Sequence, residues 1–316
     1  MRRVPTRLLP GPRRGLDWLR RTPWVGAPLP GEVAAAPTML SVEEKQLLYV
    51  LARDYIRGEG AVIDAGCFLG GSTIALAAGY AENRRARRGP PIHTYDLFAV
   101  DPSFRRDYPD LVADITGDST RPRFEAVVGR LLDHVEVHEG DICAARWPGG
   151  PIDVLFIDVC KSWAINDHVV GEFFPALVPG RSVVIQQDLI HEWLPYLTIT
   201  MGLFEDAFEL IATVPWCSAV YVATRAIRPE EIPPRLDALD AARKLKLFDR
   251  GCAPFSGEYR GVVECARAVL LENVGRRSDA VAHLAAVREK HPGSERVQHV
   301  SGEVGRWLAT QADPTA

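Results

Sequence analysis

Short apolar runs alternate with longer segments of helix-like spacing from about residue 37 to about residue 228. The apolar, β-prone runs predict strands at 61–64, 92–96, 135–138, 152–158 and 182–186. Apolar positions at helical spacing predict helices at 41–57, 73–80, 124–132, 166–177 and 193–204. Strands that alternate with helices in this way favour a parallel sheet with helices on both faces. The pattern therefore predicts an α/β fold with a doubly wound sheet.

The last part of this region breaks the alternation. Two further strands are predicted at 207–213 and 218–224, and only residues 214–217 separate them. Such a gap is too short for a crossover connection, so these strands must pair antiparallel. The sheet is thus expected to be mostly parallel, with one antiparallel strand near its end. A polar segment at 101–120 is too long for a routine connection and is interpreted as a lid or substrate loop.

The two ends of the chain differ from this core of residues 37–228. Residues 1–36 carry seven arginines among prolines and glycines and predict a flexible segment; contact with a polyanion or a membrane surface is the alternative. Residues 229–316 predict a helical appendage, with helices at 230–248, 258–273, 278–290 and 295–311. Its spacing weakly resembles one tetratricopeptide-type hairpin. The appendage is expected to pack on the core, to dimerise or to bind a partner.

A glycine-rich turn follows the first predicted strand, after Asp64. Ligands of open α/β sheets bind at the carboxyl ends of strands. Gly66 and Gly70 do not have the dinucleotide spacing G-x-G-x-x-G, which disfavours an NAD-dependent oxidoreductase. The pattern Asp-x-Gly-x-x-x-Gly resembles the first motif of class I S-adenosylmethionine-dependent methyltransferases, which implies a Rossmann-like fold and this cofactor. The implied ligands of its amino-acid end are Asp64, Ala65, Gly66, Phe68, Gly70, Gly71 and Ser72.

The next two strand ends complete the predicted cofactor site. Asp96 ends the second strand, where a carboxylate can accept hydrogen bonds from both ribose hydroxyls, as the acid does in the methyltransferase family. Leu97 and Phe98 lie beside it. Asp141 and Ile142 follow the third strand, where the family contacts the adenine.

The segment at 155–163 resembles catechol O-methyltransferase and related metal-dependent O-methyltransferases. The resemblance implies Asp158 as a metal ligand and Lys161 as general base. Gln187 and Asp188 fall where macrocin-type sugar O-methyltransferases have two acids, so the predicted ligands of Mg²⁺ are Asp158, Gln187 and Asp188. Gln187 is a departure from that pattern, since a neutral amide weakens metal affinity. His191 is the alternative base, and the predicted catalytic residues are Lys161, Asp158 and His191.

These residues suit methyl transfer from a sulfonium to an oxygen, because bound Mg²⁺ lowers the pKa of a hydroxyl and fixes its position. The predicted reaction is O-methylation of a hydroxyl on a small molecule such as a sugar or glycoside. A phenol or catechol acceptor is an alternative. A metal-independent N- or protein methyltransferase and a non-catalytic cofactor-binding protein are others.

Composition and charge limit the class of protein and its cellular compartment. At 316 residues, 47% hydrophobic and 25% charged, the chain has an ordinary globular composition. A formal net charge of −4 gives no nucleic-acid signature, and no apolar run is long enough to span a bilayer. Six scattered cysteines without a C-x-x-C motif favour buried thiols in the cytoplasm over disulfides. The expected partners are a small-molecule acceptor and a second copy of the chain in a homodimer.

Overall fold

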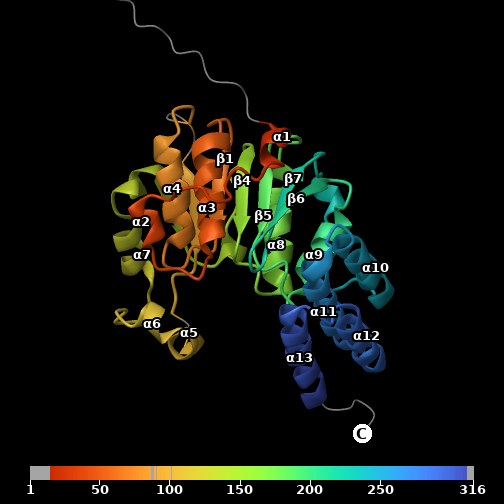
Figure 1. Ribbon diagram of the computed structural model, residues 1–316. Helices are drawn as coiled ribbons and strands as arrows, with labels where there is room; N and C mark the ends of the chain where they lie inside the picture. The colour runs from red at the N-terminus through yellow and green to blue at the C-terminus, as the bar shows by residue number, and fades with distance from the viewer. Residues whose placement is uncertain (1–14, 87–88, 90, 101, 312–316) are drawn as a thin grey trace, which may run out of the picture.

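A single seven-stranded sheet forms the centre of the molecule (Figure 1). The computed structural model describes residues 15–86, 89, 91–100 and 102–311. The strands are β1 (Ala61–Ala65), β2 (Ile92–Asp96), β3 (Val135–Glu139), β4 (Ile152–Ile157), β5 (Val183–Gln186), β6 (Phe208–Val214) and β7 (Ser218–Ala223). Their order is β3-β2-β1-β4-β5-β7-β6. Strands β1 to β5 pair in parallel, and β7 lies antiparallel to both of its neighbours. The predicted α/β fold is confirmed.

Helices cover both faces of the sheet. Those of the central region are α3 (Val42–Val50), α4 (Gly71–Glu82), α5 (Pro102–Asp107), α6 (Pro109–Val112), α7 (Arg121–Val128), α8 (Trp163–Phe173) and α9 (Pro195–Leu203). Alternate strand residues contribute to different cores: Val154 packs with α3, α4 and α7, whereas Leu155 packs with α8 and α9. Every residue of β1 and β4 is therefore buried, which explains why both strands are apolar except at Asp64 and Asp153.

Short helical turns extend several of these helices. A π-helical turn (Leu51–Tyr55) continues α3, so the helix predicted at 41–57 is irregular in its second half. The 3₁₀ turns are Gly129–His134, Ile142–Ala144, Phe174–Ala176 and Pro229–Glu231. Within the described residues, no helix has both the length and the apolar character that crossing a bilayer requires.

The N-terminal segment is more ordered than the sequence predicts. Two short helices occur here, α1 (Leu16–Leu19) and α2 (Gly31–Ala34). Leu19, Trp24 and Val33 are at most 2% exposed and join the core beneath α3 and α4. The prediction of a flexible segment over residues 1–36 is therefore wrong from residue 15 onward, because a few large apolar side chains anchor it. Residues 1–14 lie outside the described residues.

The C-terminal helices share the core of the sheet. They are α10 (Ala241–Cys252), α11 (Gly257–Asn273), α12 (Arg277–Lys290) and α13 (Glu295–Thr310). The first of them begins at Ala241 rather than near 230, because Pro233 and Pro234 cannot supply helical N–H donors. Helix α10 packs closely on α9, and side chains of α10 to α13 belong to the same hydrophobic cluster as β4. The predicted helical appendage is thus continuous with the sheet domain.

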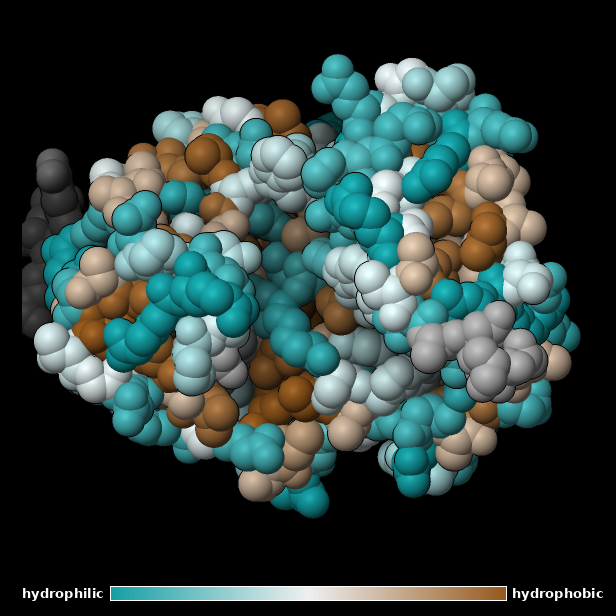
Figure 2. All heavy atoms as spheres, turned by 90° about the horizontal axis from the view of Figure 1, so that it is seen from below, coloured by the Kyte–Doolittle hydropathy of each residue, from teal (hydrophilic) through white to brown (hydrophobic). Residues whose placement is uncertain are grey.

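The carboxyl edge of the sheet lies between two projections. The pair α5–α6 extends from one side of this edge and α13 from the other (Figure 1). Seen from this edge, the surface is hollowed between the two sides, and hydrophilic residues lie within the hollow (Figure 2). The strand ends that the sequence singles out meet here.

Candidate functional site

The glycine turn after β1 is held by Asp96. One carboxylate oxygen of Asp96 accepts a hydrogen bond from the Phe68 N–H at 2.7 Å, and the other accepts from the Phe98 N–H at 2.7 Å. Gly66 has φ +94°, and a Cβ there would lie 2.8 Å from the backbone carbon and oxygen of Asp158. The turn therefore needs glycine at this position and lies directly against the end of β4.

Asp64 is a buried carboxylate with one oxygen in use. Its Oδ2 accepts hydrogen bonds from the hydroxyls of Ser72, Thr73 and Thr94 at 3.1, 2.5 and 3.1 Å. Its Oδ1 has no hydrogen-bond partner among the described residues. Burial raises the pKa of Asp64 to about 6, and the three hydroxyls oppose this shift. Since buried polar atoms without partners are rare, Oδ1 is a candidate acceptor for a donor on a bound ligand.

The predicted cofactor residues divide into accessible and buried groups. Accessible or partly accessible are Gly66, Phe68, Asp96, Leu97 and Asp141, with Leu97 62% exposed. Buried are Asp64, Ala65, Gly70, Gly71, Ser72, Phe98 and Ile142.

Several of these positions differ from the predicted contacts. The Ser72 hydroxyl donates to Asp64 instead of reaching outward. The Phe98 ring packs on Phe124 in the core, with centroids 5.1 Å apart, and offers no surface to a cofactor. Asp141 accepts from the Cys143 N–H at 2.9 Å and so starts a short 3₁₀ turn. The strongest remaining candidate ligands are therefore Asp96 and Asp64.

The segment after β2 packs on the glycine turn. The ring of Phe104 on α5 stacks on Phe68, with centroids 5.0 Å apart. Leu69 of the turn is buried against Val112 and Ile115 of the same segment. In the segment predicted as a lid at 101–120, the described residues 102–120 thus form short helices anchored at the turn. No local pattern predicts the role of Phe104, because its partner Phe68 is distant along the chain.

An acid–lysine–acid cluster lies at the ends of β4 and β5. The Lys161 ammonium donates to Asp158 Oδ1 at 2.8 Å and to Asp188 Oδ2. The two acids are largely buried, at 21% and 16% side-chain exposure, whereas Lys161 is 53% exposed. Adjacent parallel strands bring these residues together, and Asp188 adopts φ +63° as the chain leaves β5.

Electrostatics in this cluster oppose the predicted role of Lys161. Burial lowers the pKa of Lys161, but the two carboxylates outweigh it and hold this pKa above its ordinary value. Burial raises the pKa of Asp158, and the ammonium opposes that shift. The raised pKa favours the ammonium form of Lys161, which disfavours its predicted role as general base; that role stays a prediction. Of the two residues, Asp158 is the better candidate for a base.

The predicted magnesium ligands are only partly arranged for a metal. Asp158 and Asp188 converge, but the Lys161 ammonium lies between them. The Gln187 side-chain nitrogen lies 3.3 Å from Cys217 Sγ, which in turn donates to Asp188 Oδ1 at 3.4 Å. Among the described side chains, no third His, Cys, Asp or Glu completes a compact ligand group with these acids. In this arrangement the Lys161 ammonium fills the space between the two acids, so a metal could bind there only after the lysine side chain moves.

His191 is separate from this cluster. Its Nδ1 accepts from the Trp193 N–H at 3.3 Å and lies 3.4 Å from a Glu192 carboxylate oxygen. No contact within the described part of the chain joins it to Lys161 or Asp158. Its role as alternative base stays a prediction.

The C-terminal helices border the site. The Trp193 ring packs edge-on against Trp307 of α13, with centroids 5.5 Å apart. On the same helix, the Arg296 guanidinium donates to the Ile190 carbonyl oxygen at 3.4 Å and to that of Trp216. The segment after β5 is therefore held by a helix that lies more than a hundred residues further along the chain.

A separate cavity of about 710 Å³ lies on the outer side of α8, against the proline-containing segment before α10. Its lining is mixed, with charged side chains that include Arg146, Asp167 and Arg235. Asp167 accepts from the Leu236 N–H at 3.2 Å, which ties that segment to α8. The cavity contains none of the predicted cofactor or catalytic residues.

Comparison with known proteins gives similarity to solved structures only. No family model and no curated protein matches the chain. CalS11, a calicheamicin methyltransferase, is 20% identical with a TM-score of 0.42, over 66% of this chain and 90% of that one. Cofactor-bound Rv0187 from MTB is 19% identical with a TM-score of 0.39, over 67% and 90%.

An O-methyltransferase from Bacillus cereus, in complex with SAH, is also similar. It is 20% identical with a TM-score of 0.29, over 60% of this chain and 70% of that one. At identities of 19–20% and TM-scores of 0.29–0.42, these similarities carry no argument about the function of this chain.

Proposed function

We propose that the chain is an S-adenosylmethionine-dependent O-methyltransferase that acts on a hydroxyl of a small molecule. One observation carries the proposal: the glycine turn and the acid–lysine–acid cluster abut. Asp158 N–H donates to the Ala65 carbonyl at 2.8 Å, and Gly66 has no room for a side chain beside Asp158. A methyl donor held at the turn would therefore lie next to groups that can bind and deprotonate a hydroxyl.

Two carboxylates would hold the cofactor. Asp96 is partly exposed and keeps lone pairs beyond the two that accept backbone N–H groups, so it can accept from the ribose hydroxyls. Asp64 Oδ1 would accept from the ammonium of the amino-acid end. When bound, the cofactor supplies a methyl group on a positively charged sulfur.

Two side chains would act on the acceptor, and a third would hold one of them in position. The Lys161 ammonium would donate to the acceptor oxygen and orient it. Asp158, with its raised pKa, would take the hydroxyl proton as the oxygen attacks. Asp188 would keep Lys161 in place.

Magnesium assistance is a second form of the same proposal. Asp158 and Asp188 would hold the ion once Lys161 leaves the space between them, and the ion would lower the pKa of the acceptor hydroxyl. A sugar or glycoside acceptor follows from the resemblance to macrocin-type enzymes, and a phenol is the alternative.

Calorimetric titration with S-adenosylhomocysteine tests the cofactor. We expect micromolar or tighter binding in the wild type and at least tenfold weaker binding in Asp96→Ala. Asp110→Ala, an exposed acid on α6, is the matched control. No binding to the wild type would refute the proposal.

Methyl transfer from labelled cofactor to a panel of sugars, glycosides and phenols tests the reaction. Chelation distinguishes the metal-free mechanism, in which Lys161 orients the acceptor, from the magnesium-assisted one. Turnover that survives EDTA would require the metal-free mechanism. Lys161→Met should then abolish turnover, whereas Lys246→Met, an exposed lysine on α10, should not. If magnesium is required instead, Lys161→Met should bind it more tightly, since the ammonium no longer competes. Cofactor binding without turnover on any acceptor would favour a non-catalytic binding protein.

A further inference from the structure

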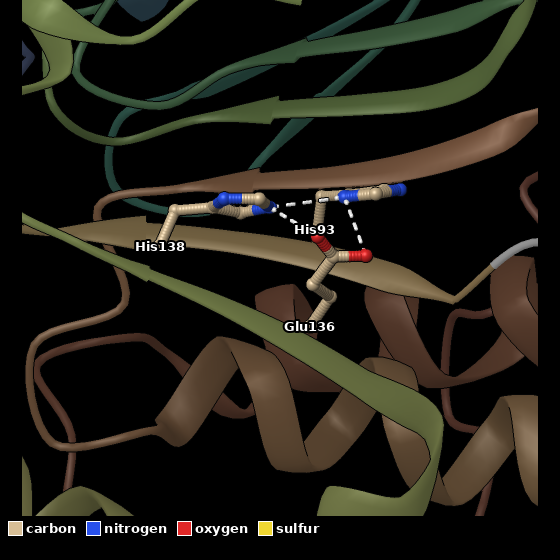
Figure 3. Close-up of side chains that lie close together, drawn as sticks. All are labelled: His93, Glu136 and His138. Carbon is tan, nitrogen blue, oxygen red and sulfur yellow. Dashed lines mark hydrogen bonds and ion pairs between the residues drawn. The ribbon is translucent and has the colours of Figure 1, made fainter. Parts of the chain in front are cut away.

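A histidine–glutamate–histidine group lies on strands β2 and β3, apart from the site described above. In the parallel register His93 is opposite Glu136, and Tyr95 is opposite His138. Since side chains alternate between the faces of a strand, His93, Glu136 and His138 share one face of the sheet. Figure 3 shows the three side chains directed toward one another from the two strands.

The distances among their ligand atoms are short. His93 Nδ1 and His138 Nε2 are 3.0 Å apart. Each of these nitrogens lies 3.7 Å from an oxygen of the Glu136 carboxylate. In the described part of the chain, this is the only group of three His, Cys, Asp or Glu residues whose ligand atoms all lie within 4.8 Å of one another.

These distances match a metal's coordination sphere. Zinc binds nitrogen at about 2.0–2.1 Å and carboxylate oxygen at about 2.0–2.2 Å, so ligand atoms of a tetrahedral site lie about 3.4 Å apart. The observed values of 3.0 and 3.7 Å bracket that separation. The two 3.7 Å distances end on different oxygens of the Glu136 carboxylate, so a rotation of this exposed side chain would bring one of its oxygens and both nitrogens around one ion.

The surroundings hold both imidazoles in place. The His138 ring stacks on Tyr95, with centroids 4.3 Å apart. The His93 ring is perpendicular to that of Trp147 in a T-shaped contact, with centroids 5.0 Å apart. The carboxylate side is open, because Glu136 is 55% exposed and His138 is 32% exposed. An ion can therefore enter from solvent and keep water as its fourth ligand.

We propose that His93, Glu136 and His138 form a binding site for a transition-metal ion of the zinc type. Two imidazoles and one carboxylate are typical of zinc with an open fourth position, whereas Mg²⁺ and Ca²⁺ prefer oxygen ligands alone. The ion would join the edge strand β3 to its neighbour β2. Because it binds the folded arrangement, it would stabilise the protein by mass action.

The site is tested on the untagged, metal-free chain with Zn²⁺ and Co²⁺ as probes. Equilibrium dialysis and calorimetry should give one ion per chain, and bound Co²⁺ should show the intense visible absorption of a tetrahedral site. Zn²⁺ should raise the unfolding temperature, and excess Mg²⁺ should not displace it. This readout needs neither cofactor nor turnover, so it is independent of the proposed function.

Variants locate the site. Glu136→Gln and His138→Asn should each weaken Zn²⁺ binding at least tenfold, because each changes a ligand, and loss of even a hydrogen-bond partner of a ligand costs about 10–100-fold in metal affinity. His299→Asn is the control, since His299 is 71% exposed on α13 and pairs with Glu303 only four residues away. Glu136→Gln keeps the test valid if His138→Asn fails to fold, because its side chain is exposed. Substoichiometric binding, or equal binding in Glu136→Gln and the wild type, would show that the group is only a hydrogen-bonded histidine pair.

Discussion

Replacing Gly251 by alanine should separate α10 from α9. Gly251 and Gly202 lie at the point where these helices cross. A Cβ on Gly251 would overlap the Thr198 carbonyl oxygen and would lie 2.9 Å from the Gly202 nitrogen. Both are backbone atoms of α9, so no side chain can rotate away. The helices would have to move apart to accept one methyl group.

The expected loss of stability follows from two opposing effects. Alanine in place of glycine favours a helix by about 0.5–1 kcal/mol. Overpacking a filled core costs about 1–3 kcal/mol, and this contact is with rigid backbone, at the upper end of that range. The free energy of unfolding should therefore fall by about 2 kcal/mol. Leu247 and Phe248, which lie beside the crossing and are at most 2% exposed, would lose packing contacts as the helices move apart.

Gly171→Ala is the matched control. Gly171 also lies near the end of a helix, α8, but a Cβ there would have no atom within 4 Å. This variant should be about 0.5–1 kcal/mol more stable than the wild type. Urea unfolding followed by circular dichroism measures both. If Gly251→Ala is as stable as Gly171→Ala, the close crossing is wrong, and with it the docking of the C-terminal helices on the sheet.

Three further predictions concern the cofactor turn. The pKa of Asp64 is raised to about 6 in the folded state, whereas an aspartate in the unfolded chain releases its proton near pH 4. The contribution of Asp64 to the free energy of unfolding should therefore fall as the pH rises from about 4 to about 6. Cofactor affinity should rise over the same window, and calorimetry should find it pH-independent there in Asp64→Asn. Asp96→Asn should weaken S-adenosylhomocysteine binding by about 10–100-fold, since a hydrogen bond to a charged group contributes about 1.5–3 kcal/mol; an unchanged titration would contradict the ribose role. Phe104→Ala should lose about 0.5–1.5 kcal/mol of stacking on Phe68, and limited proteolysis should then cut α5–α6 faster than in the wild type, while equal cleavage would count against the anchoring.

Much of the fold could be predicted because the signals are local. The run at 152–158 is apolar on both faces apart from Asp153 and Asp158, a pattern typical of a strand that is covered on both faces, and β4 is fully buried. The gap at 214–217 forces an antiparallel pair by its length alone, and β6 and β7 form that pair. The helix predicted at 230–248 is wrong before Ala241, because the prolines at 233 and 234 prevent a helix there despite the apolar spacing.

The candidate site was predictable in its strand ends but not in its charges. The acids Asp64, Asp96 and Asp158 follow from the strand pattern. The cationic state of Lys161 does not, since it depends on two carboxylates that β4 and β5 bring together from different parts of the chain. The contacts of Arg296 and Trp307 with the segment after β5 could likewise not be predicted from the sequence, because they join residues more than a hundred positions apart along the chain.

The sequence by itself determined the order of strands and helices, the antiparallel last pair and the glycine turn, because hydrophobic period and connection length act within a few residues. Tertiary structure decided which polar side chains meet. Leu19 and Trp24 anchor a segment that composition describes as flexible, and His93 faces Glu136 and His138 only through the register of two parallel strands. Contacts of this kind depend on how distant segments pack, and the local sequence around one residue does not specify which distant residue it will contact.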